Sequence, residues 1–131
     1  MIPLTAEREV LLVRQYRYGT EEFTLEIPGG MCDGDEEPQA AARRELIEET
    51  GHDASEWFEL GWVNPNPAIQ NNRCYTFLAE GVVRVGEPRP DENEAFEQLR
   101  VPLSEIPDLI DQRRITHALV VAAFQLLSAR S

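Results

Sequence analysis

The sequence predicts an α/β (α+β) fold in which a mixed sheet lies between helices. Two observations carry this prediction. Short apolar stretches typical of strands alternate along the chain with stretches typical of helices, in the order strands, helix, strands, helix, and this order is typical of a sheet covered by helices. The 131 residues are 42% hydrophobic, enough for one core, so we expect residues 1–131 to form a single domain.

The first half of the chain predicts two strands and a helix. Residues 9–18, EVLLVRQYRY, begin with an apolar run and end with arginine and tyrosine, which indicates a strand buried at its start and exposed at its end. Residues 23–27, FTLEI, alternate apolar and polar side chains, as a strand with one buried face does. Pro28 and two glycines end it. Residues 38–49 predict a helix that begins at proline and stops at Gly51.

The second half predicts four short strands, a loop and two helices. The loop is NPNPAIQNN, residues 64–72, which is too rich in proline and asparagine to be regular. A short helix is expected around residues 104–112, and a long, mostly buried helix from near Ile115. The four strands are expected over residues 59–63, 74–79, 82–85 and 96–101.

The charge balance restricts the partners. Asp and Glu number 24 against 12 Lys and Arg, a formal charge of −12, which disfavours binding to nucleic acid or an anionic membrane. A polyanionic substrate would need metal ions or a local arginine cluster. The sequence shows neither a membrane span nor a signal peptide, so we expect a cytoplasmic protein. Cys32 and Cys74 are best explained as reduced thiols.

Three glutamates stand at the wrong end of the predicted helix. Glu45, Glu48 and Glu49 face the negative end of the helix dipole, at roughly 0.3 to 1 kcal/mol each when exposed. At about 100 degrees per residue they project from one narrow stripe. With a carbonyl of the Gly29–Gly30 turn they would offer hard oxygen ligands for Mg²⁺ or Mn²⁺, and Arg44 could hold a carboxylate in place. Taken alone, this stretch would more often be a solvated helix face.

The spacing of the surrounding residues favours a functional site over a solvated helix face. Gly30 is followed after five residues by Glu36, and after seven more by Arg44-Glu45-Leu46, one residue, Glu48-Glu49, one residue and Gly51. This string resembles the signature of the Nudix hydrolase family at every fixed position, and the strand order is similar along most of the chain. His52 departs from the pattern, where the family usually has an aliphatic residue; we expect a helix-end histidine with little effect on catalysis.

The resemblance implies a Nudix-type α/β/α sandwich that hydrolyses a pyrophosphate bond with divalent metal ions. It implies metal ligands at Glu45, Glu48, Glu49 and the Gly29 carbonyl, with Arg44 and Glu36 supporting the loop and helix that begin at Gly30. The family commonly takes its general base from a glutamate on a loop before a late strand. In DENEAFEQLRV, residues 91–101, Glu92 fits best and Glu94 nearly as well; a solvated acidic loop is the alternative.

Within the family the chain looks most similar to the ADP-ribose and nucleoside-diphosphate-sugar pyrophosphatases, on LLVRQYRYG, LEIPGG and Pro67. Arg17 and Arg73 are candidates for binding the diphosphate, or are surface ion pairs. Similar proteins form homodimers and carry an extra N-terminal strand region that this chain lacks, so it is trimmed or its base recognition is loose. A nucleoside triphosphate pyrophosphohydrolase and a non-catalytic nucleotide-sugar sensor are the alternatives; the full set of glutamates argues against the sensor.

Overall fold

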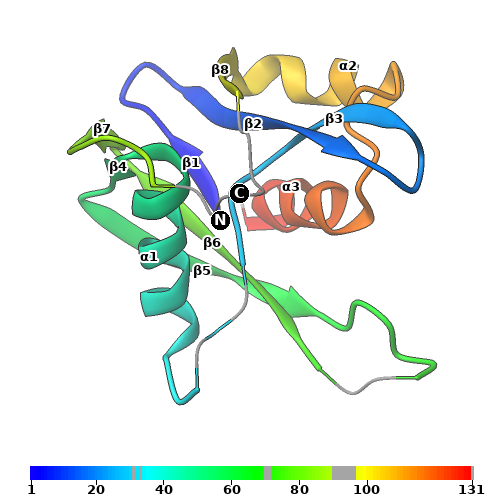
Figure 1. The fold of residues 1–131 in the computed structure, drawn as a ribbon, viewed down its shortest axis with the longest axis horizontal. Coiled ribbons are helices and arrows are strands. Elements are labelled where there is room, and N and C mark those ends of the chain that lie inside the picture. Colours follow the sequence, from blue (N-terminus) through cyan, green and yellow to red (C-terminus); the bar gives the residue numbers. More distant parts are fainter. Residues whose placement is uncertain (31, 33, 70–71, 90–96, 131) are drawn as a thin grey trace.

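The computed structural model describes residues 1–30, 32, 34–69, 72–89 and 97–130. Figure 1 shows the elements in chain order. The strands are β1 (Ile2–Leu4), β2 (Glu9–Arg17), β3 (Glu22–Glu26), β4 (His52–Asp53), β5 (Glu56–Val63), β6 (Cys74–Glu80), β7 (Val83–Arg84) and β8 (Glu97–Pro102). The helices are α1 (Pro38–Thr50), the 3-10 turn η1 (Leu103–Glu105), α2 (Ile106–Asp111) and α3 (Ala118–Arg130).

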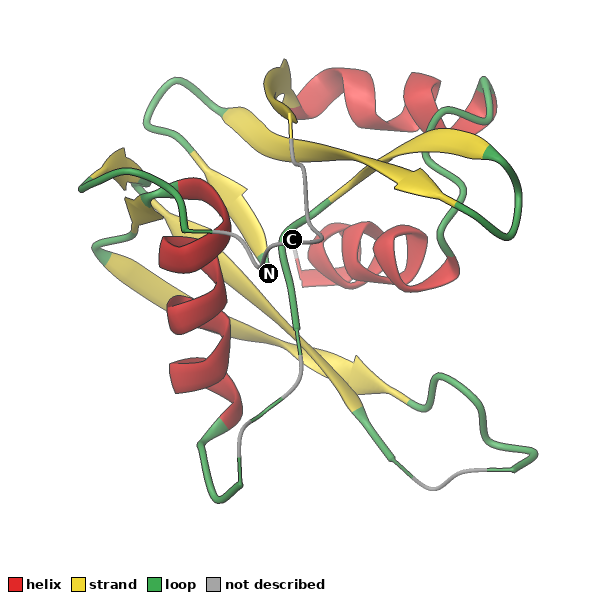
Figure 2. Cartoon of the chain, viewed as in Figure 1, coloured by secondary structure: helices red, strands yellow, loops and turns green. Residues whose placement is uncertain are grey.

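The main sheet is mixed, as predicted. Its strands run in the order β3-β2-β1-β6-β5, and β8 pairs with β2. β1 and β6 are parallel, with Ile2 opposite Leu78, whereas the other pairs are antiparallel. A separate pair, β4 and β7, lies beside the end of α1. Figure 2 shows the sheet in yellow with helices on both sides of it.

Alternation along β6 explains why helices cover both faces. Phe77 and Ala79 pack in one cluster with Leu46 of α1. Leu78, which lies between them in sequence, packs in a second cluster with Phe124 of α3. Since successive strand residues point to opposite faces, α1 and α3 lie on opposite sides of the sheet. The predicted α/β/α arrangement is confirmed.

The start of β2 also follows its sequence pattern. Its first residues are buried and its last ones are half-buried or exposed, which confirms the predicted gradient. Residues Val13, Gln15 and Arg17 lie on one face of the strand and line a cavity described below. None of the described helices is long and apolar enough to cross a membrane.

Several boundaries differ from the prediction. β1 was not expected, because three residues are too few to show a periodic pattern, yet Ile2 and Leu4 are almost fully buried in the middle of the sheet. The long helix begins at Ala118 and not near Ile115, because the His117 ring nitrogen accepts the N–H of Leu119 and so caps the helix there. β5 begins before residue 59, and the strand expected over 82–85 is the shorter β7. Residue 96, where the last strand was expected to begin, lies outside the described residues.

The end of α1 is closed by the chain that follows β7. Gly51 has the left-handed φ of 70° and donates its N–H to the carbonyl of Ile47, a common helix ending. The Gly51 carbonyl accepts the N–H groups of Val85 and Gly86, and the Glu48 carbonyl accepts that of Arg89 at 2.6 Å. Residues 85–89 therefore satisfy helix carbonyls that would otherwise have no partner within the helix.

Candidate active site

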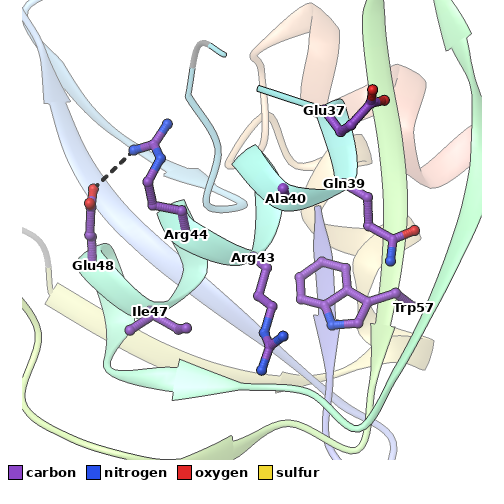
Figure 3. Close-up of a pocket in the computed structure, with 8 residues that line it drawn as sticks. All are labelled: Glu37, Gln39, Ala40, Arg43, Arg44, Ile47, Glu48 and Trp57. Atoms are coloured by element: carbon purple, nitrogen blue, oxygen red, sulfur yellow. Dashed lines mark hydrogen bonds and ion pairs between the residues drawn. The ribbon is translucent and has the colours of Figure 1, made fainter. Parts of the chain in front are cut away.

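Arg44 is the centre of the acidic cluster on α1. Its guanidinium donates to both carboxylate oxygens of Glu36, at 3.0 and 3.1 Å. A third nitrogen donates to Glu45 at 2.9 Å and to Glu48 at 3.2 Å; Figure 3 shows the bond to Glu48. These bonds are of the kind by which Arg44 was expected to hold a carboxylate in place. One cation thus offsets the repulsion among the carboxylates at the unfavourable helix end.

Gly30 makes room for Glu45. A Cβ added at Gly30 would lie within 3 Å of the Glu45 carboxylate, closer than Cβ atoms approach other heavy atoms. The loop after β3 and the exposed turn of α1 therefore touch at this glycine, and any side chain here would displace a candidate metal ligand. The same close approach places Gly29 beside Glu49, whose carboxylate accepts the Gly29 N–H at 3.4 Å.

Glu48 and Glu49 open onto different hollows. Glu48 lines an outer groove of about 690 Å³ along α1, together with Arg43, Ile47 and Trp57; Figure 3 shows Glu48, Arg43 and Ile47 on the helix and Trp57 beside it. Glu49 is 6% exposed and lines an inner cavity of about 350 Å³ with Gly29 and Gly30. The cluster of glutamates lies on α1 where the helix adjoins both the outer groove and the inner cavity.

The donor set fits a hard divalent cation. Carboxylate oxygens and a backbone carbonyl are the ligands that Mg²⁺ and Mn²⁺ prefer, and Glu45, Glu48, Glu49 and Gly29 supply them from two neighbouring segments. Among the described residues no three acidic, histidine or cysteine side chains already converge as a metal site. Arg44 binds Glu45 and Glu48, whereas Glu49 accepts the Gly29 N–H.

The candidate bases, Glu92 and Glu94, lie outside the described residues. Both described flanks of that segment are fixed to the end of α1. Arg89 donates its N–H to the Glu48 carbonyl at 2.6 Å, and Gln98 donates its side-chain amide to the Thr50 carbonyl at 3.1 Å.

The inner cavity lies between β2, β3, β6 and the start of α3. Its polar lining includes Gln15, Arg17, Glu26, Thr76 and His117. Arg17 donates to both oxygens of Glu26, one bond measuring 2.7 Å, and the Thr24 hydroxyl donates to the same carboxylate at 2.6 Å. Burial alone would raise the pKa of Glu26, but the bonds from Arg17 and Thr24 outweigh it and hold that pKa below its usual value.

The other predicted substrate residues lie apart from this cavity. Arg73 precedes β6 and stacks its guanidinium 4.0 Å from the centre of the Trp62 ring, a cation–π contact. Pro67 is exposed in the loop between β5 and β6. Neither of them is in the described lining of the cavity. Arg17, by contrast, lines the cavity, and its guanidinium is hydrogen-bonded to Glu26.

His52 is buried at 5% exposure next to the end of α1. Its Nδ1 lies 2.8 Å from the Thr50 carbonyl, the same oxygen that Gln98 binds. Its Nε2 and the Trp57 Nε1 are the buried side-chain polar atoms that find no partner among the described residues. The expectation of a helix-end histidine is confirmed.

Sequence reasoning missed Glu26, His117, Gln15 and Thr76 as cavity residues. The period-2 pattern of residues 13, 15 and 17 could have placed Gln15 beside Arg17 on one strand face. His117 had no such signal, because its position depends on where a distant helix begins. Cys32 and Cys74 are free, as predicted, and burial raises the pKa of the Cys74 thiol, which favours its protonated form.

Comparison with known proteins places these features in context. The profile of the NUDIX domain matches residues 1–124. An ADP-ribose pyrophosphatase of Bacillus subtilis (strain 168) is 31% identical over 99% of this chain and 71% of its own length. A methanol dehydrogenase activator of Bacillus methanolicus is 30% identical over 97% of this chain and 69% of its own. The crystal structure of an ADP compounds hydrolase superposes with a TM-score of 0.87 and 28% identity, covering 98% of this chain and 68% of that one.

Proposed function

The chain belongs to the NUDIX domain family, and on that premise we propose that it hydrolyses the diphosphate bond of ADP-ribose or a related nucleoside diphosphate sugar, releasing a nucleoside monophosphate and a sugar phosphate. The observation that carries the proposal is the cluster in which Arg44 binds Glu36, Glu45 and Glu48 while Glu49 faces Gly29. The similarity to an ADP-ribose pyrophosphatase favours this substrate class.

Members of the NUDIX family use divalent metal ions, and here Mg²⁺ or Mn²⁺ is proposed, held by Glu45, Glu48, Glu49 and the Gly29 carbonyl. When bound, such an ion neutralises diphosphate charge and lowers the pKa of a coordinated water. The protein's own contribution is positional. Arg44 holds Glu45 and Glu48 on one side of α1, and Gly30 leaves the space into which Glu45 extends.

Glu92 is the proposed general base, with Glu94 as the second choice. Support comes from the described flanks of their segment, since Arg89 and Gln98 both bind carbonyls at the end of the helix that carries Glu48 and Glu49. A base must come within hydrogen-bond reach of the water that it deprotonates. Attachment of both flanks to this helix end is what such a role requires.

Arg17 is proposed to bind the diphosphate from the cavity side. Two bonds to Glu26 fix the direction of its planar guanidinium, and an oriented guanidinium suits phosphate recognition. Arg73 is proposed as a second phosphate-binding residue, with Pro67 shaping the loop before it. The stacking of Arg73 on Trp62 supports an ordered guanidinium at that end of the hairpin.

A homodimer and a cytoplasmic location complete the proposal. An aromatic patch is exposed on the β2–β3 hairpin, where Tyr18 is 86% and Phe23 59% exposed, and Tyr16 lies 4.9 Å from the Tyr18 ring. Exposed apolar patches of this kind mark interaction surfaces, which supports a second subunit here. Two free cysteines fit a reducing compartment.

The test is turnover of ADP-ribose, GDP-mannose, UDP-glucose and a nucleoside triphosphate with magnesium, with products identified by chromatography. We expect ADP-ribose or another nucleoside diphosphate sugar to give two monophosphates and no pyrophosphate. Release of pyrophosphate from the triphosphate as the main reaction would replace the proposal with its triphosphate alternative. A wild-type enzyme that cleaves none of the four would overturn it.

Two variants connect that turnover to the helix. Glu48→Gln and Glu49→Gln should each lower kcat by more than about 100-fold, beyond what changes behind a metal ligand usually cause. Their unfolding temperatures in metal-free buffer should stay unchanged or rise, because each removes repulsion at the wrong helix end. Glu59→Gln, on the exposed side of β5, is the matched control and should behave like wild type.

A further inference from the structure

The inner cavity carries a recognition pattern that the diphosphate does not require. It extends from Glu49, Gly29 and Gly30 at one end to Glu26 and His117. At about 350 Å³ it is near the lower limit of ligand pockets, so it suits one sugar and not a whole nucleotide sugar. No Phe, Tyr or Trp is in its described lining, so it lacks the aromatic faces on which a base would stack.

His117 presents a defined donor. Its carbonyl accepts the N–H groups of Val120 and Val121, and its Nδ1 accepts the N–H of Leu119 at 3.1 Å, so it caps the start of α3. A neutral imidazole whose Nδ1 accepts a hydrogen bond carries its proton on Nε2. Within the described part of the chain, the hydrogen bond that the His117 ring makes is the one at Nδ1, and Nε2–H donates to no other side chain or carbonyl. The fold therefore fixes which ring nitrogen can donate to a ligand.

Glu26 presents a complementary acceptor. An ionised carboxylate has about four acceptor positions, and the two bonds from Arg17 and the one from Thr24 occupy three of them. Glu26 is 5% exposed, so its remaining acceptor position faces the cavity that the residue lines and not bulk water. His117 lies near enough to interact electrostatically with this carboxylate.

A donor and an acceptor side by side select one kind of group. A phosphate only accepts hydrogen bonds, so it can bind the remaining N–H groups of Arg17 but not the Glu26 carboxylate, whereas a sugar hydroxyl both donates and accepts. Gln15 and Thr76, which line the same cavity, are also able to do both. Resting on the proposed function, we infer that His117 and Glu26 form the subsite for the hydroxyls of the second sugar, the one that leaves as the sugar phosphate, and that His117 determines specificity for it.

The variant His117→Asn separates this role from helix capping. Asparagine is a good N-cap, and its side-chain oxygen can replace Nδ1 as acceptor for Leu119, but the Nε2–H is lost. With ADP-ribose, KM should rise about 3- to 10-fold with little change in kcat, the size expected for one lost hydrogen bond. With the methyl ester of ADP, which has the same diphosphate and no second sugar, KM should not change. Thr116→Ala, at an exposed neighbouring position, is the control.

A second measurement does not depend on the variants. The chain has two histidines, so imidazole resonances are simple to assign by NMR, with the His117→Asn spectrum identifying the missing one. His117 should show the Nε2–H tautomer, and its signals should shift with ribose 5-phosphate but not with methyl phosphate, both without metal. Equal shifts with both compounds, no shift with either, or equal KM changes for ADP-ribose and the methyl ester would overturn the inference. A wild-type enzyme inactive on all nucleotide sugars would overturn the proposed function instead, whatever ribose 5-phosphate does.

Discussion

At the scale of single residues, the candidate site is built by groups that keep the glutamates in place. Arg44 contacts Glu36, Glu45 and Glu48, and Gly30 allows Glu45 to lie against the preceding loop. A neighbouring cation and an absent side chain thus accommodate carboxylates that the helix dipole disfavours. These positions can be altered one at a time.

Gly30→Ala should reduce activity while leaving the fold intact. The added Cβ would collide with the far end of the Glu45 side chain, which can move by rotating and so costs little stability, but its carboxylate would leave the position of a metal ligand. We expect kcat to fall at least about 10-fold, with a denaturation midpoint close to that of wild type. Gly19→Ala, where the added Cβ meets nothing within 4 Å, should change neither quantity. An active Gly30→Ala enzyme would contradict the placement of Glu45 at the metal.

The sequence was sufficient for the residues fixed by short-range spacing. Glu45, Glu48 and Glu49 were predicted to project from one stripe of the helix, with Arg44 near enough to hold a carboxylate, and Arg44 binds Glu45 and Glu48 in the structure. Glu26 and His117 were not predicted, because their meeting depends on how a hairpin and a helix about 90 residues later pack. Such contacts have no local pattern from which to infer them.

At the scale of elements, the end of α1 depends on segments far along the chain. Gly51 turns the backbone at φ 70°, and its carbonyl is bound by Val85 and Gly86. The helix ended where Gly51 predicted, and it began at Pro38. β1 could not be predicted, since three residues give no periodicity and its place in the sheet comes from β6.

Gly51→Ala should destabilise the protein. An alanine there would hold a left-handed backbone, at about 1–3 kcal/mol, and its Cβ would meet the backbone oxygen of Gly86, which cannot rotate away. The free energy of unfolding, measured with urea, should fall by at least the cost of the left-handed backbone, about 1–3 kcal/mol. The matched control is Gly86→Ala, at the other side of the same contact, where the added Cβ has open space. Equal stability of the two variants would show that the end of α1 is not held as described.

At the scale of the whole molecule, a net charge of −12 coexists with local ion pairs that need their carboxylates ionised. Arg43 donates to both oxygens of Asp53, at 2.7 to 3.1 Å. These bonds hold the pKa of Asp53 below its usual 3.8. Acid therefore has two opposed effects, since protonation relieves the general repulsion and removes such pairs.

Comparing variants across pH separates the two effects. Because the pKa of Asp53 is lower in the folded than in the unfolded state, its contribution to stability is complete above 3.8 and is lost as the pH falls through the folded-state pKa. Between pH 7 and pH 3, Asp53→Asn should therefore lose less stability than wild type in urea titrations. Asp111→Asn, an exposed substitution at the end of α2, should follow the wild-type curve. Parallel curves for Asp53→Asn and wild type would rule out the Arg43 pair as a source of acid sensitivity.

The position of β1 has a consequence for how the protein is made. β1 lies in the middle of the sheet, between β2 and β6, and its parallel partner residues are Leu78 to Glu80. β2 can pair with one edge of β1 as soon as it is made, with Leu4 opposite Val10, but until β6 has emerged from the ribosome the other edge of β1 has no partner strand. Pairing of such distant segments slows folding. A ribosome-bound chain stopped before β6 should accordingly remain open to proteases. In a chain extended beyond β6, that strand can pair with β1 and bury it.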